Sequence, residues 1–128
     1  MRIPLKNFIP GIAWFFLVSV LLFLPGDDLP SPYPWLEMIY FDKWVHAGLF
    51  VVLTVLFMWP VAVSGMKKKA IVKWLLFIAI ACSVWGLITE IIQYLLPGRN
   101  FDLRDWAADT SGAVLAYIFV TFILQKNK

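Results

Sequence analysis

The chain has 128 residues, of which 62% are hydrophobic and 15% are charged, and its formal net charge is +3 at neutral pH. Soluble domains contain about 25% charged residues, so this composition argues against an ordinary water-soluble domain and favours a protein that lies largely in lipid. A nucleic-acid-binding domain is also excluded, because its Lys and Arg residues would gather on one water-facing surface, whereas here they are divided between the termini and the loops.

Four continuous apolar stretches follow one another along the chain, at about residues 8–24, 44–63, 70–96 and 106–124. Each approaches or exceeds the ~20 residues with which a helix crosses ~30 Å of hydrocarbon. Their continuity, without polar alternation, favours helices over strands. The sequence therefore predicts an all-α membrane protein, a four-transmembrane-helix bundle that forms one domain over residues 1–128.

The connections between these spans are short and differ in character. The first, residues 25–43, is rich in Pro and acidic residues, and its side chains Tyr33, Trp35 and Tyr40 favour the membrane interface. The second contains the basic turn SGMKKK at residues 64–69, and the third, PGRNFDLRD at residues 97–105, opens with Pro-Gly. None of them is long enough for a second domain.

Basic and acidic residues separate to opposite sides of this four-span arrangement. The side of the termini holds most of the basic residues: Arg2, Lys6, Lys67, Lys68, Lys69, Lys73, Lys126 and Lys128. The positive-inside rule makes that side, and both termini, cytoplasmic. All acidic residues then lie toward the outer side: Asp27, Asp28, Glu37, Asp42, Glu90, Asp102, Asp105 and Asp109.

Polar side chains at the outer ends of three spans are predicted to meet. The candidate site residues are Asp42, Lys43 and His46 from the second span, Glu90, Gln93 and Arg99 from the third, and Asp105 and Asp109 from the fourth. Within each group, residues three or four positions apart share a helix face. Because a charge below the headgroups costs at least ~2.5 kcal/mol, we expect Glu90 and Asp109 to face the bundle interior beside partners.

Several of these outer-side residues also have a structural interpretation. Asp42 and Asp102 are candidate helix N-caps, and Asp105 would complete a capping box with Asp102. Arg104 would extend toward phosphate headgroups.

Small residues in the spans are typical of close helix packing, as at Gly86 and Gly112. The only cysteine, Cys82, is expected to be a packing residue, so an intramolecular disulfide and a Cys-based zinc site are excluded.

At these residues the sequence resembles the VanZ-like family of small bacterial membrane proteins. The pattern reads DKWVH at 42–46, EIIQ at 90–93, PGR at 97–99, Asp105, and DTSG at 109–112, and it covers about residues 40–120. Asp109 stands where the pattern has Asn, which adds a negative charge that Arg99, Lys43 or a metal would offset. The resemblance implies a multi-pass protein of the bacterial cytoplasmic (inner) membrane and cell envelope, in a family named after a protein implicated in teicoplanin resistance.

Three functions remain open on the sequence alone. In the first, the eight candidate residues bind an anionic lipid headgroup, a cell-wall precursor or a lipoglycopeptide, with a link to glycopeptide resistance. In the second, a membrane hydrolase or transferase acts on a lipid-linked substrate, with His46 or Glu90 as its candidate catalytic base. In the third, a structural or accessory protein uses the polar cluster to lock its bundle.

The enzyme alternative has a metal variant, although no metal and no cofactor is predicted from the sequence. The ligand set would be His46, Glu90, Asp105 and Asp109, an oxygen-rich group suited to Mg²⁺, Mn²⁺ or Zn²⁺. No hydrolase signature accompanies it. The expected partners are therefore membrane lipids and a lipid-linked ligand, with no nucleic acid, and no partner protein is indicated.

Overall fold

A computed structural model of the chain describes residues 3–25 and 33–126. Four residues used above to orient the chain, Arg2, Asp27, Asp28 and Lys128, lie outside the described residues.

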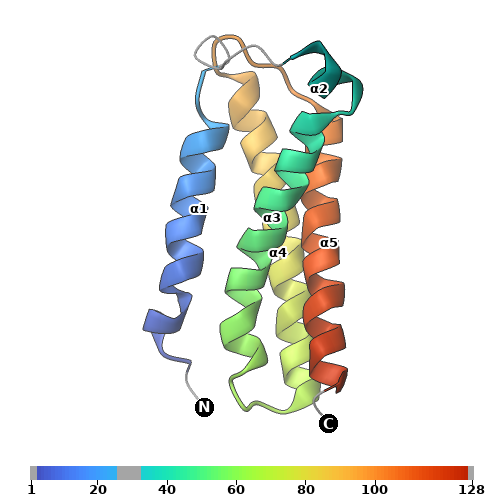
Figure 1. Cartoon of the computed structure of the whole chain (residues 1–128). Coiled ribbons are helices and arrows are strands. Elements are labelled where there is room, and N and C mark those ends of the chain that lie inside the picture. The colour runs from blue at the N-terminus through green and yellow to red at the C-terminus, as the bar shows by residue number, and fades with distance from the viewer. Residues whose placement is uncertain (1–2, 26–32, 127–128) are drawn as a thin grey trace.

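The described residues form four long helices and two short ones (Figure 1). They are η1 (Leu5–Phe8), α1 (Ile9–Leu22), α2 (Pro34–Met38), α3 (Phe41–Ala62), α4 (Lys68–Tyr94) and α5 (Leu103–Lys126). The continuous segment of η1 and α1, and each of α3, α4 and α5, is long and apolar enough to cross a membrane. The predicted all-α fold with four candidate spans is confirmed.

The helices begin and end within a few residues of the predicted boundaries. α3 and α5 each begin three residues earlier than their apolar runs, because polar and aromatic residues form their first turns. α4 ends at Tyr94, shortly before Pro97, and Gly98 in the following turn has a positive φ of 68°. This conformation costs glycine little.

The core of the bundle lies between α3, α4 and α5, and α1 packs against only two of them. One apolar cluster contains Met58, Val61, Ala62, Ile71, Leu75, Ala79 and Val120. A second contains Val18, Leu22, Phe50, Leu53, Cys82 and Ala113, which confirms Cys82 as a buried packing residue. Within the described residues α1 contacts α3 and α4 but not α5, so the three last helices form the central unit.

The acidic residues are confined to one half of the bundle. η1, the end of α5 and the α3–α4 connection lie at one end, and α2 and the α4–α5 connection lie at the other (Figure 1). The first end, called the basic end below, holds Lys6, Lys67, Lys68, Lys69 and Lys126 among the described residues. The second, called the acidic end, holds Glu37, Asp42, Asp102 and Asp105 together with Lys43, Arg99 and Arg104.

Two glycines let the helices approach closely near the acidic end. A Cβ atom at Gly112 would lie 2.4 Å from the carbonyl oxygen of Ala47, so α5 crosses directly over the backbone of α3 there. A Cβ at Gly86 would lie 2.9 Å from the Cβ of Asp109, which brings α4 against α5. The predicted close packing at small residues is therefore present, and it draws the three helices together around Asp109.

We predict that Gly112→Ala lowers the thermal midpoint of the detergent-solubilised protein, measured by tryptophan fluorescence. The added methyl group meets rigid backbone, and such overpacking costs about 1–3 kcal/mol. Gly48→Ala is the matched control, because no atom lies within 4 Å of a Cβ there. It should leave the midpoint unchanged or raise it, since Ala is favoured over Gly in a helix by roughly 0.8–1 kcal/mol. Equal effects of the two substitutions would contradict the close crossing.

Candidate functional site

Lys43, in the first turn of α3, is surrounded by carboxylates. Its Nζ atom lies 2.6 Å from Oδ2 of Asp42, 2.7 Å from Oδ2 of Asp102 and 2.5 Å from Oδ1 of Asp105. Two of these three carboxylates come from the entrance of α5, so the ammonium group ties α3 to α5. One positive charge among three negative ones leaves no free cation at Lys43 for an anionic ligand.

His46, Glu90 and Asp109 meet inside the bundle, from α3, α4 and α5 respectively. Nδ1 of His46 lies 3.0 Å from Oδ1 of Asp109, and one donor atom from each of the three residues lies within 4.8 Å of the others. Glu90 and Asp109 are completely buried and His46 is 8% exposed. These three residues are called the inner triad below.

A line of acidic side chains connects the acidic end with the inner triad. The exposed fraction of these side chains falls inward, from 61% for Asp42 and 38% for Asp102 to 16% for Asp105 and 0% for Asp109. Asp105 lies between the two groups, because its Oδ1 contacts Lys43 and its Oδ2 is 3.9 Å from Nε2 of His46. The predicted meeting of polar groups from three helices is thus present for these residues.

Asp102 caps α5, as its position before the helix predicts. Its Oδ1 accepts a hydrogen bond of 2.8 Å from the backbone N–H of Arg104. The predicted capping box with Asp105 does not form, because Asp105 turns toward Lys43. Instead, the backbone N–H of Asp102 donates to Oε2 of Glu90 at 3.0 Å, so a side chain from α4 satisfies the start of α5.

The other candidate cap, Asp42, does not cap its helix. The N-cap of α3 is Tyr40, whose φ of 53° is left-handed, and no side chain accepts a hydrogen bond there. Asp42 pairs with Lys43 instead.

Gln93 and Arg99 bond to the end of α1 rather than joining the inner triad. Nε2 of Gln93 and Nη2 of Arg99 both donate to the carbonyl oxygen of Leu22, at 2.8 Å and 3.1 Å. The last carbonyl groups of a helix lack partners within the helix, which explains the need for donors at this point. No sequence pattern indicates Leu22 as their acceptor, since α1 ends far from both residues in the chain.

An open cavity of about 410 Å³ lies at the acidic end, between α2 and the first turns of α3 and α5. Its lining contains both signs of charge and two aromatic rings: Leu36, Glu37, Tyr40, Phe41, Asp42, Lys43, Asp102 and Arg104. The candidate set contained Asp42 and Lys43 but missed Glu37, Asp102 and Arg104 as lining residues. The available signal was their common position at the acidic end of the bundle. The sequence pattern favours a helix cap for Asp102 and a headgroup contact for Arg104, and it indicates no role in a site for Glu37.

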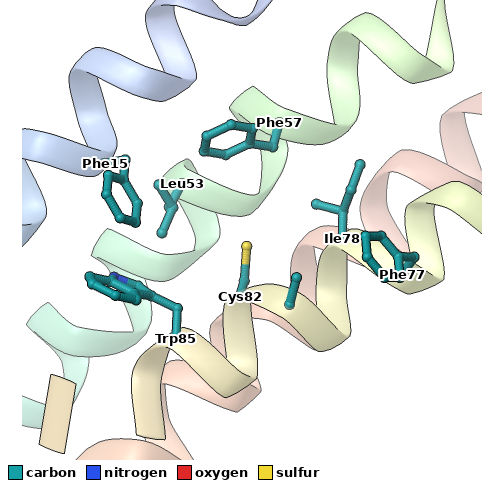
Figure 2. A pocket seen from close by; sticks show the side chains of 8 residues that line it. Phe15, Leu53, Phe57, Phe77, Ile78, Cys82 and Trp85 are labelled. Atoms are coloured by element: carbon teal, nitrogen blue, oxygen red, sulfur yellow. The ribbon is translucent and has the colours of Figure 1, made fainter. Parts of the chain in front are cut away.

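A second pocket, of about 280 Å³, lies between α1, α3 and α4 and is apolar. Figure 2 shows Phe15, Leu53 and Trp85 pointing toward it from these three helices. The rings of Phe15 and Trp85 are 4.7 Å apart between centroids. With Cys82 as its only titratable lining residue, this pocket suits a hydrocarbon chain rather than polar chemistry.

We predict that Asp102→Asn lowers the thermal midpoint near pH 7 and that its difference from the wild type shrinks in acid. The hydrogen bond from Lys43, and then the N–H of Arg104, lowers the pKa of Asp102 below its ordinary value of 3.8 against the opposing effect of burial. A carboxylate whose pKa is lowered by folding stabilises the protein at a pH above its ordinary pKa. This stabilisation is lost as the pH falls through the lowered pKa. Asn retains an oxygen for the cap, so the comparison isolates the charge.

Glu37→Gln is the control for this measurement, since it removes an exposed carboxylate at the same end of the bundle. A midpoint difference between the wild type and Asp102→Asn that persists or grows as the pH falls through the lowered pKa would show that the Lys43 contact does not stabilise ionised Asp102.

Comparison with known proteins connects this arrangement with a family. A family model described as VanZ/LLP1 matches residues 5–124, which run from η1 to the last turns of α5. No curated protein and no solved structure matches the chain. The matched region includes all four candidate spans, the Lys43 contacts and the inner triad, in agreement with the resemblance in the motifs. The chain belongs to the VanZ/LLP1 family.

Proposed function

We propose that this VanZ/LLP1 family protein binds the polar headgroup of a lipid or a lipid-linked molecule in the cavity at the acidic end. The observation that supports the proposal is the cavity itself, a space of about 410 Å³ whose lining includes the cationic residue Arg104 and the acidic residues Glu37 and Asp42. Neither His46 nor Glu90 lines this cavity, so binding is favoured over catalysis by either residue.

The charges around the cavity define the class of ligand. Three carboxylates already neutralise Lys43, whereas no described carboxylate lies within ion-pair distance of the Arg104 guanidinium. Arg104 is therefore the group that would hold a phosphate, with paired N–H donors. Glu37 and Asp42 would accept hydrogen bonds from hydroxyl, amide or ammonium groups of the same headgroup.

Anionic phospholipids, lipid-linked cell-wall precursors and lipoglycopeptides such as teicoplanin all offer a charged polar part on a hydrocarbon chain. A link to glycopeptide resistance would follow from binding the last two of these ligands.

The expected position is the bacterial cytoplasmic membrane, with the acidic end on its outer side. The positive-inside rule supports this direction, because the described lysines at the basic end flank the spans. Tyr33, Trp35 and Tyr40 are exposed around α2, and aromatic side chains of this kind favour the headgroup level. The cavity would then open among lipid headgroups.

We predict that a cysteine at position 100 is labelled by a membrane-impermeant maleimide in intact cells, whereas one at position 125 is not. Asn100 is exposed in the α4–α5 connection and Gln125 is exposed at the basic end of α5. Both substitutions, Asn100→Cys and Gln125→Cys, are made in a Cys82→Ala background and leave the charge unchanged. Permeabilised cells, in which both should react, provide the control, and the inverse labelling pattern would contradict the proposed direction.

We predict that Arg104→Gln weakens the retention of phosphatidylglycerol about tenfold or more, because a hydrogen bond to a charged group contributes roughly 1.5–3 kcal/mol. Native mass spectrometry of protein from nanodiscs with equal phosphatidylglycerol and phosphatidylcholine measures this retention. Lys69→Gln, which removes an exposed cation at the basic end, is the matched control. Equal lipid retention by the wild type and Arg104→Gln would count against the cavity as the binding site, and teicoplanin serves as a second probe in the same assay.

A further inference from the structure

Beneath this cavity, the inner triad has acceptor atoms that nothing within the described chain satisfies. Oε1 of Glu90 and Oδ2 of Asp109 are buried and have no hydrogen-bond partner. Both side chains are fully buried, and each has its other oxygen engaged, with the N–H of Asp102 and with His46. We propose that His46, Glu90 and Asp109 bind a divalent metal cation of the Zn²⁺ or Mn²⁺ class.

The charge balance favours neutralisation of Glu90 and Asp109 by a dication rather than by His46 and Lys43 alone. Buried carboxylates are normally paired or coordinated to a metal, because removing them from water without compensation is costly. A protonated His46 offsets one negative charge at most, and Lys43 is already shared among the three carboxylates around it. A dication between Glu90 and Asp109 balances both charges at once and uses their free oxygens.

The spacing of the donor atoms is close to that of a coordination sphere. With metal–ligand bonds of about 2.1 Å, neighbouring donors lie about 3 Å apart and opposite donors about 4.2 Å apart. Nδ1 of His46 and Oδ1 of Asp109 are already at 3.0 Å. One donor atom from each residue of the triad lies within 4.8 Å of the other two, which is slightly more than the separation of opposite ligands in such a sphere.

Neighbouring groups surround the three ligands. Metal-binding histidines usually direct their second ring nitrogen to a carboxylate, and Nε2 of His46 faces Oδ2 of Asp105 at 3.9 Å, which is longer than a hydrogen bond. The backbone N–H of Asp102 fixes Oε2 of Glu90. A Cβ at Gly86 would lie 2.9 Å from Oδ2 of Asp109, so the glycine leaves the space that this free oxygen occupies.

The donor set also indicates the metal. One imidazole nitrogen and two carboxylates suit Zn²⁺ or Mn²⁺ better than a soft metal. Three protein ligands leave at least one coordination position for water or another oxygen ligand. The site is distinct from the headgroup cavity, since none of its three residues lines that cavity.

The test measures metal content and thermal stability of the full-length protein in detergent. After treatment with EDTA and dialysis against Zn²⁺ or Mn²⁺, inductively coupled plasma mass spectrometry should find about one metal per wild-type chain, the stoichiometry of a three-ligand site. The thermal midpoint should rise with metal concentration, because a ligand of the folded state stabilises it. Glu90→Gln and Asp109→Asn should bind at least about tenfold more weakly, as losses in metal sites typically do.

Two matched variants separate this proposal from the proposed function. Glu37→Gln and Arg104→Gln alter the headgroup cavity but not the inner triad, so they should retain the metal and its thermal shift. If Glu90→Gln or Asp109→Asn fails to fold, electron spin echo of Mn²⁺ bound to the wild type provides an independent readout, in which coupling to a histidine nitrogen is expected. A wild type without stoichiometric metal, a Mn²⁺ signal without nitrogen coupling, or undiminished binding by the two triad variants would overturn the proposal.

Discussion

The burial of Asp109 is the constraint on which the acidic half of the bundle depends. A carboxylate with no exposed surface in an apolar medium requires a polar partner, and His46 of α3 is that partner. Gly86 of α4 lies directly against the same side chain. The contacts of Asp109 therefore set the register of α3, α4 and α5 relative to one another. The apolar clusters further along the bundle pack in that same register.

Asp105 unites the two levels of the site. It contacts Lys43 on one side and approaches His46 on the other, so the exposed and buried groups form one electrostatic network. Because three carboxylates surround Lys43, the proposed headgroup site depends on Arg104 rather than on Lys43 to hold an anion. The proposed metal site depends on the buried carboxylates of the inner triad. The two proposals therefore assign an anion to the acidic end and a cation to the interior of the bundle.

Hydrophobic run length and charge pattern were sufficient to predict the four spans and the convergence of Lys43, His46, Glu90 and Asp109 toward the acidic end of the bundle. Helical spacing identifies which residues share a face, but it does not identify the neighbour that this face meets. Gln93 illustrates the limit, because its partner is the backbone of α1 at Leu22. The short helix α2 was also not predicted, since its five residues after Tyr33 show no apolar periodicity. Contacts to backbone atoms and to connecting segments depend on which distant segments become neighbours in the fold, and a single sequence contains little information about this.

The anchoring of α1 at Leu22 has a consequence for the order of assembly. Its carbonyl oxygen is held by Gln93 and Arg99, which lie 71 and 77 residues further along the chain. Chains are synthesised from the N-terminus, so α1 emerges from the ribosome well before either donor exists. The acidic end of α1 is consequently fixed late, although the helix is made early, because its docking at Leu22 requires that α4 and the connection after it are already in place.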